Sequence, residues 1–200
     1  MDYPRRGSRF APGLARRFLA LIGWRIAGEL PACPRFVLIE APHTSNWDFI
    51  FALLAMFATD LRVSWLGKHT IFRFPLGPLL RWLGGEPVNR AAAHRAVSTA
   101  VEHFRGRTQW VLALSPEGTR RRVEQWKNGF HRIAVGAGVP IVPVWIDYQA
   151  REIGIGAPLR PGPDEAADVA TLRALFRKEM ARHPERFAEC LIAPISQIGD

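Results

Sequence analysis

One histidine and one aspartate are spaced so that a carboxylate could orient an imidazole. His43 lies in a loop after an apolar segment, and Asp48 follows at the start of the next apolar segment. Because this loop precedes an expected helix, it can fold the imidazole onto the carboxylate, which would hold one ring nitrogen and leave the other free as a base. The alternative is that Thr44, Ser45 or Asn46 only caps the helix and that His43 is a polar neighbour of the cap.

Glu117, Gly118, Thr119 and Arg120 form a second candidate cluster, in a Pro-Glu-Gly-Thr-Arg sequence that follows another apolar segment. A guanidinium presents a planar set of donors that suits phosphate oxygens, so Arg120 could bind phosphate while Glu117 orients it or a substrate hydroxyl. The alternative is a local salt bridge in a turn. Ser115 lacks the Gly-x-Ser-x-Gly surroundings of a nucleophilic serine, which argues against acyl-serine chemistry.

Three further cations stand at the expected ends of strands or helices. Arg90 follows two glycines that permit close backbone approach and precedes a helix, a position that favours anions. Lys68 comes just after a strand candidate, and Lys127 lies near a helix start. Each also fits ordinary surface charge. The six histidines show no metal-ligand spacing, and the two cysteines imply no disulfide framework, so we expect no metal site.

These side chains would be positioned by strands that alternate with helices. In a parallel sheet, ligands bind at the carboxyl ends of the strands, where the loops of His43 and Glu117 would lie. The alternation predicts an α/β fold, a single layered domain with a largely parallel central sheet flanked by helices. We expect strands at 35–40, 61–66, 109–114 and 140–146, and helices at 47–59, part of 72–83, 91–104, 127–137 and 164–182.

The first thirty residues combine apolar and basic side chains as a helix at a membrane surface does. We expect residues 1–30 to be an amphipathic N-terminal segment, with ordinary packing against the main domain, 31–200, as the alternative. The longest apolar stretch, at 49–58, falls short of the roughly 18 residues of a membrane-spanning helix, and the start lacks a secretory cleavage pattern. The apolar positions at helical spacing are Phe10, Leu14, Phe18, Leu21 and Trp24.

The balance of charge favours anionic partners. The net charge is +9, which attracts nucleic acid, an anionic membrane or phosphorylated small molecules. Most of the positive residues are arginines, including those at 120–122. A solvated basic face is the alternative for any one of them.

Four blocks in this order resemble those of the glycerolipid acyltransferases, the family that includes the 1-acylglycerol-3-phosphate acyltransferases. The blocks are His-x4-Asp at 43–48, Gly-Glu-Pro-Val-Asn-Arg at 85–90, Pro-Glu-Gly-Thr-Arg at 116–120 and Val-Pro-Ile-Val-Pro at 139–143. Two features depart from the family pattern. Ser115 stands where the family usually has phenylalanine, and the block at 85–90 is a loose version.

The resemblance implies an O-acyltransferase that moves a fatty acyl group from acyl-CoA or acyl-ACP to a hydroxyl of a lysophospholipid or glycerol-phosphate-like acceptor. His43 would be the general base and Asp48 its partner. Residues 117–120 would bind the phosphate and glycerol end of the acceptor, with Arg90 assisting. For the oxyanion site, the candidates are Lys68 and the backbone amides near the helix that follows His43. We expect no cofactor beyond the thioester co-substrate, peripheral contact with an anionic membrane at the cytoplasmic side of the inner membrane, and no nucleic-acid partner.

Two other functions stay open on the sequence alone. A lipid esterase would use the pair of His43 and Asp48 to activate water, and it would release free fatty acid. A non-enzymatic binder of anionic membrane or nucleic acid would depend on charge alone. Its binding would weaken steeply with salt and survive His43→Ala.

Overall fold

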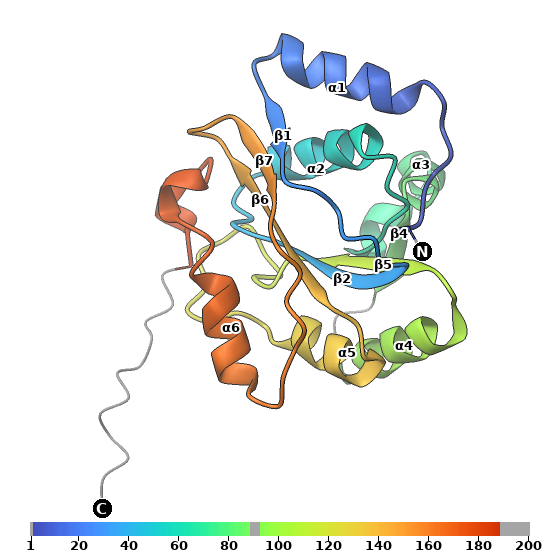
Figure 1. The fold of residues 1–200 in the computed structure, drawn as a ribbon, viewed down its shortest axis with the longest axis vertical. Coiled ribbons are helices and arrows are strands. Elements are labelled where there is room, and N and C mark those ends of the chain that lie inside the picture. The colour runs from blue at the N-terminus through green and yellow to red at the C-terminus, as the bar shows by residue number, and fades with distance from the viewer. Residues whose placement is uncertain (1, 89–92, 189–200) are drawn as a thin grey trace, which may run out of the picture.

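The computed structural model describes residues 2–88 and 93–188. Within these ranges, a seven-stranded sheet runs through the middle of the protein in the order β1-β7-β6-β2-β5-β3-β4 (Figure 1). Five strands, β2 to β6, are parallel, β7 is antiparallel to β6, and β1 runs parallel to β7. The expected α/β fold with a largely parallel sheet is confirmed. The strands are β1 Arg25–Ala27, β2 Arg35–Glu40, β3 Ser64–Lys68, β4 Gly85–Val88, β5 Trp110–Leu114, β6 Ile141–Asp147 and β7 Glu152–Ile155.

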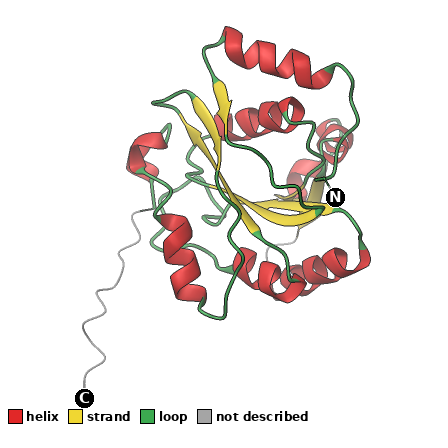
Figure 2. Ribbon diagram, in the orientation of Figure 1, coloured by secondary structure: helices red, strands yellow, loops and turns green. Residues whose placement is uncertain are grey.

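Helices cover both faces of this sheet (Figure 2). Helices α1 and α2 pack on one face, and α4, α5 and α6 pack on the other. The described helices are α1 Ala11–Leu21, α2 Asn46–Ala58, α3 Leu76–Trp82, α4 Ala93–Gly106, α5 Gly129–Ala137 and α6 Glu165–Arg173, with 3₁₀ turns at His69–Phe72, Lys178–Met180 and Pro184–Arg186.

The interior positions of the central strands are apolar because both faces of these strands are covered. In β2, Phe36 packs with α1 and α2, whereas Val37 and Ile39 pack with α4, α5 and α6. All three side chains are fully buried. Successive strand residues point to opposite faces, so β2 is packed from both sides and holds the first residue of the following loop in place.

Three strands were not predicted. The first, β1, has three residues, β4 contains Gly85 and Pro87, and β7 contains Gly154. Glycine and proline weaken the strand pattern, and proline is tolerated in a strand mainly at a sheet edge, where β4 lies. A Cβ atom on Gly154 would overlap the ring of Trp145, so glycine is required by the neighbouring strand.

Two predicted elements have different bounds. The helix expected at 164–182 is wrong beyond Arg173, because the chain turns after Ala174 so that Phe176 and Met180 become buried. The ring of Phe176 packs 5.6 Å from that of Trp126. The strand expected at 61–66 begins only at Ser64. The first two residues of the helix expected at 91–104 lie outside the described residues.

The apolar side chains expected on one face of the N-terminal helix point away from the protein, except Trp24, which follows the helix and is buried. The exposed fractions of Phe10, Leu14 and Leu21 are 83%, 72% and 83%. On the opposite side of α1, Leu19 is buried, and Nε of Arg16 donates to the carbonyl of Ala58 at the end of α2. Helix α1 therefore packs on the domain and also presents an apolar outer surface.

The first thirty residues also contribute to the sheet, because β1 pairs with β7 at its edge. The boundary at residue 30 stays a prediction. Among the described residues, we find no helix whose length and apolar character suffice to cross a membrane.

Candidate active site

Three neighbouring strands bring the candidate residues to one edge of the sheet. Strands β6, β2 and β5 are adjacent and parallel, so their carboxyl ends meet. His43 follows β2, Glu117 follows β5 and Tyr148 follows β6. Residues far apart in the sequence are thus gathered where an α/β sheet binds its ligands.

His43 lies against two carboxylates. Its Nδ1 is 2.9 Å from Oε2 of Glu40 and 3.5 Å from Oδ2 of Asp48. All three side chains are largely buried, with exposed fractions of 16%, 13% and 0% for His43, Glu40 and Asp48. The shorter contact is not aligned as a hydrogen bond, so it is a close contact between the imidazole and the carboxylate.

Asp48 holds the loop as well as facing the imidazole. Its Oδ2 accepts from the backbone N–H groups of Thr44 and Ser45 at 2.8 and 2.7 Å. Oγ of Ser45 in turn accepts from the backbone N–H of Asp48, which completes a capping box at the start of α2, and it also accepts from the N–H of Trp47. Capping by Ser45 and the approach of His43 to Asp48 were alternatives on the sequence, and the structure shows both together.

Tyr148 is the other partner of Asp48. Its hydroxyl donates to Oδ1 of Asp48 at 2.7 Å, so both oxygens of this carboxylate are held. Burial, together with the charge of Asp48, raises the pKa of Tyr148 well above its usual value. The tyrosine therefore stays protonated and serves as a hydrogen-bond donor.

The charges around His43 favour the imidazolium form. Burial alone lowers the pKa of His43, but the carboxylates of Glu40 and Asp48 outweigh this effect and raise it above the usual value. The nearby guanidinium of Arg120 acts in the opposite direction. An imidazole in these surroundings is a stronger base than a free one, and the positive charge it gains is stabilised.

Glu117 joins the second cluster to the first. Its Oε2 accepts from the backbone N–H of His43 at 3.1 Å, and its side chain is only 2% exposed. Burial raises the pKa of Glu117 to about 8. Among the ion pairs between described residues, none joins Glu117 to Arg120: the carboxyl group of Glu117 accepts from His43, and Arg120 is exposed.

The tight turn after Glu117 requires glycine. Gly118 has a φ of +63°, and its Cα faces the side chain of Lys127, whose backbone N–H donates to Pro116. A side chain at this position would be strained and would press on the lysine. Oγ1 of Thr119 accepts from the N–H of Arg121, so this threonine stabilises the loop.

Two predicted cations are not placed with this cluster. Lys68 is exposed at the end of β3, and its side chain forms no hydrogen bond or ion pair with any residue in 2–88 or 93–188. Arg90 lies outside the described residues. Their roles in substrate binding stay predictions.

Sequence reasoning missed two residues of this site, Glu40 and Tyr148. Glu40 was counted as the last residue of a buried strand, but a charged side chain at the end of such a strand, before a functional loop, is itself a signal. Tyr148 had the same kind of signal, a polar side chain just past a predicted strand.

Glu40, His43 and Asp48 also offer donors that could hold a metal ion. One ligand atom from each lies within 4.8 Å of the other two. Two carboxylates and an imidazole suit several divalent ions. The sequence-based expectation of a metal-free site stays a prediction.

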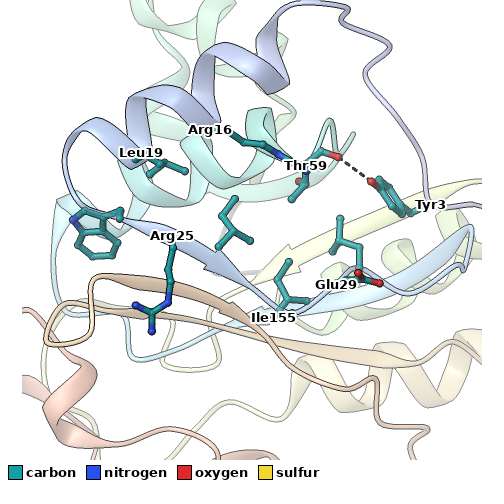
Figure 3. Close-up of a pocket in the computed structure, with 12 residues that line it drawn as sticks. Tyr3, Arg16, Leu19, Arg25, Glu29, Thr59 and Ile155 are labelled. Atoms are coloured by element: carbon teal, nitrogen blue, oxygen red, sulfur yellow. Dashed lines mark hydrogen bonds between the residues drawn. The ribbon is translucent and has the colours of Figure 1, made fainter.

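A cavity with a mixed lining lies beneath α1, beside β1 (Figure 3). Its volume is about 550 Å³; Leu19, Trp24 and Ile155 are among its apolar lining residues, and Arg16, Arg25 and Glu29 also line it. One of its lining residues, Trp24, stacks on Phe51 at 3.9 Å and lies 5.3 Å from the ring of Tyr148.

Comparison with known proteins gives a consistent family. A family model described as Acyltransferase matches residues 28–147. The 1-acyl-sn-glycerol-3-phosphate acyltransferases of Salmonella typhimurium and Escherichia coli are each 32% identical over 122 residues, 58% of this chain and 48% of theirs. That of Haemophilus influenzae is 25% identical over 138 residues, 64% of this chain and 56% of its own. The chain spans about half the length of the curated relatives it matches.

A solved structure has the same arrangement of strands and helices. The crystal structure of the 1-acyl-sn-glycerophosphate (LPA) acyltransferase PlsC from Thermotoga maritima matches with a TM-score of 0.60 and 19% identity. The match covers 82% of this chain and 74% of that one. At this identity the likeness establishes the fold.

Proposed function

Because the chain belongs to the acyltransferase family, as the match over residues 28–147 shows, we propose that it transfers a fatty acyl group from an acyl thioester to a hydroxyl of a phosphate-bearing lysolipid. The curated relatives are named 1-acyl-sn-glycerol-3-phosphate acyltransferases, which favours a 1-acylglycerol 3-phosphate as the acceptor. Acyl-CoA and acyl-ACP are both candidate donors.

One observation carries this proposal. The imidazole of His43 has its Nδ1 against the carboxylates of Glu40 and Asp48, and the Glu117 loop adjoins it directly. A histidine held in this way at the carboxyl edge of the sheet can act as a general base through Nε2.

The reaction follows from this arrangement. Nε2 of neutral His43 takes the proton of the acceptor hydroxyl as that oxygen attacks the thioester carbonyl. The carbon–sulfur bond then breaks, and the thiolate leaves and receives the proton from the imidazolium. Glu40 and Asp48 stabilise the transient positive charge, and Tyr148 keeps Asp48 in place. A positioned base contributes on the order of 10²- to 10⁴-fold, so substrate orientation must supply much of the remaining acceleration.

The cavity beneath α1 offers apolar surface to an acyl chain. Leu19, Trp24, Ile26 and Ile155 line it together with charged residues, and the ring of Trp24 contacts that of Tyr148. The apolar segments at 49–58 and 72–83 differ in burial. Phe51 and Met56 of α2 are buried, whereas Phe74 and Trp82 are 90% and 62% exposed. We assign the cavity beneath α1 as the first candidate for the acyl chain.

The outer surface of α1 supports contact with a lipid bilayer. Its exposed apolar side chains, Phe10, Leu14 and Leu21, are accompanied by the exposed arginines Arg9 and Arg17. Apolar insertion combined with positive charge is the binding mode of interfacial helices on anionic membranes. An acceptor that is itself a lipid would be met at this surface, at the cytoplasmic side of the inner membrane.

The test uses purified protein, labelled acyl-CoA or acyl-ACP, and a panel of lysolipids. The proposal is supported if the protein forms a diacyl product and His43→Ala lowers the rate of its formation by about 10²-fold or more. His69→Ala, at an exposed histidine, is the control and should keep the rate of the parent. Release of free fatty acid in place of an acylated lipid would instead identify a lipid esterase. Equal rates for the parent and His43→Ala would remove His43 as the base.

A further inference from the structure

A cationic cavity lies beside the His43 loop, partly built by residues beyond the family match. Its volume is about 420 Å³, and it is lined by residues 44–47, Arg120, Arg182, His183 and Arg186. Three arginines and a histidine thus line one space, and no acidic residue is among its lining residues. The family match ends at residue 147, so Arg182, His183 and Arg186 belong to a part of the chain that it leaves unassigned.

The segment that carries these cations is tied to the loop of the candidate base. The backbone N–H of His183 donates to Oγ1 of Thr44 at 3.3 Å, and Nη1 of Arg186 donates to the carbonyl of Thr44 at 3.2 Å. Before it, the N–H of Tyr148 donates to the carbonyl of Met180. Because Thr44 adjoins His43 in the chain, an anion held by this segment would lie close to the base.

The guanidinium of Arg182 is held over two aromatic rings. It lies 5.5 Å from the ring centres of both Trp47 and Tyr148. No ion pair of Arg182 forms within the described ranges. Stacking of this kind fixes the plane of the guanidinium and leaves its N–H donors available for an anion.

One carboxylate stands at the rim of the cavity. Oε1 of Glu185 lies 3.7 Å from Nε of Arg186 and 3.4 Å from Nδ1 of His183, with the side chain of Glu185 66% exposed. A single exposed carboxylate does not neutralise three guanidinium groups, since exposed pairs are screened by water. Arg120 lies close enough to His43 to affect its pKa, so the positive wall reaches the reaction centre.

We propose that Arg182 and Arg186, together with Arg120, bind a phosphate group in this cavity. Several convergent guanidinium groups match the charge and the tetrahedral oxygens of a phosphate monoester. The assignment of this phosphate to the lysolipid acceptor rests on the proposed function, since the donor thioester also carries phosphates. A short glycerol unit joins the acceptor's phosphate to its free hydroxyl, which agrees with a phosphate site adjacent to the base.

Steady-state kinetics distinguish the two sources. Arg182→Gln removes a cation that makes no hydrogen bond within the described residues, and Arg186→Gln is paired with Arg186→Lys, which keeps the charge. The matched control is Arg160→Gln, an exposed arginine between β7 and α6. We expect the acceptor KM to rise about 10- to 100-fold in the two glutamine variants, with the donor KM unchanged, and Arg186→Lys to recover part of the loss.

The same experiment can contradict the proposal. A donor KM that rises while the acceptor KM stays constant would overturn the assignment to the acceptor and place a donor phosphate in the cavity. If both KM values stay at the level of the parent and Arg160→Gln, the cavity does not bind phosphate during the reaction.

A binding measurement separates this inference from the proposed function. Thermal unfolding is followed in inorganic phosphate and in chloride of equal ionic strength. Phosphate stabilises proteins in general, so each protein's rise in Tm from chloride to phosphate is compared with that of a variant carrying both Arg182→Gln and Arg186→Gln. We expect the parent and Arg160→Gln to show a larger rise in Tm than this double variant, and this difference is the extra rise. An extra rise without acyl transfer would retain the phosphate site and refute the function. Acyl transfer by a parent with no extra rise would retain the function and refute the site.

Discussion

Glu40 gives the sharpest test of the catalytic arrangement, because sequence motifs identify Asp48 as the partner of His43 whereas the structure places Glu40 closer. At an effective dielectric constant of about 20, a pair of unit charges interacts by roughly 6 kcal/mol at 2.9 Å and roughly 5 kcal/mol at 3.5 Å. The two carboxylates therefore contribute comparably to the imidazolium. Neutralising one of the two carboxylates should remove about half of the electrostatic stabilisation of the His43 imidazolium.

The expected loss in Glu40→Gln follows from that proportion. Removal of a positioned base costs on the order of 10²- to 10⁴-fold, so half of this effect on a logarithmic scale corresponds to about 10- to 100-fold in kcat/KM. Asp48→Asn should lose at least as much, because Asp48 also holds the loop at Thr44 and Ser45. The double variant should approach His43→Ala.

The dependence of the rate on pH supplies a readout that a purely structural role would not change. His43 must be neutral to accept a proton, so kcat/KM rises as the pH passes its pKa. Since Glu40 raises the pKa of His43, Glu40→Gln should move this acid limb to lower pH. Glu102→Gln, an exposed acid on α4, is the control. An acid limb that stays in place with an unchanged rate would refute the role of Glu40.

Four further predictions test the surroundings of the site. Tyr148→Phe removes the hydrogen bond to Asp48 and should lower the free energy of unfolding by about 1.5 to 3 kcal/mol in urea titrations, together with kcat; unchanged values for both would show that the bond is dispensable. The raised pKa of Glu117, about 8, means that its stabilisation is full below pH 4.5 and is lost as the pH rises through 8, so Glu117→Gln should flatten the fall in Tm over this interval. Leu14→Glu on α1 should reduce sedimentation with anionic vesicles, whereas Val135→Glu on α5 should not; equal binding would exclude the outer surface of α1. Dialysis against a chelator should leave turnover unchanged, and a loss restored by a divalent ion would assign a metal to the three-donor cluster.

The local sequence pattern was sufficient to predict the strands and helices that position the candidate site. Strand β2 was expected at 35–40 and is found at Arg35–Glu40, because its apolar run is covered on both faces. Helix α5 ends before Gly138, which has the left-handed conformation of a helix C-cap, as expected. The prediction failed where contacts between distant residues determine the structure. After Arg173 the helix ends and Phe176 is buried, and no local sequence pattern indicates this.

The candidate site shows the same division. The loops of His43 and Glu117 could be located from the sequence, because each follows a recognisable buried strand. Their mutual arrangement could not, since the hydrogen bond from His43 to Glu117 depends on β2 and β5 being neighbours. Arg182 was expected inside a helix, so its approach to Trp47 had no sequence signal.

The hydrogen bonds from residues 183 and 186 to Thr44 have a consequence for biosynthesis. A ribosome completes the family motifs long before it reaches these residues, so a nascent chain would possess its proposed base while one wall of the cationic cavity is still missing. A nonsense mutation after codon 181 would likewise preserve every recognisable motif. Gene-finding by motif would count such an allele as intact, although its product would lack the last contacts that close the loop around the base.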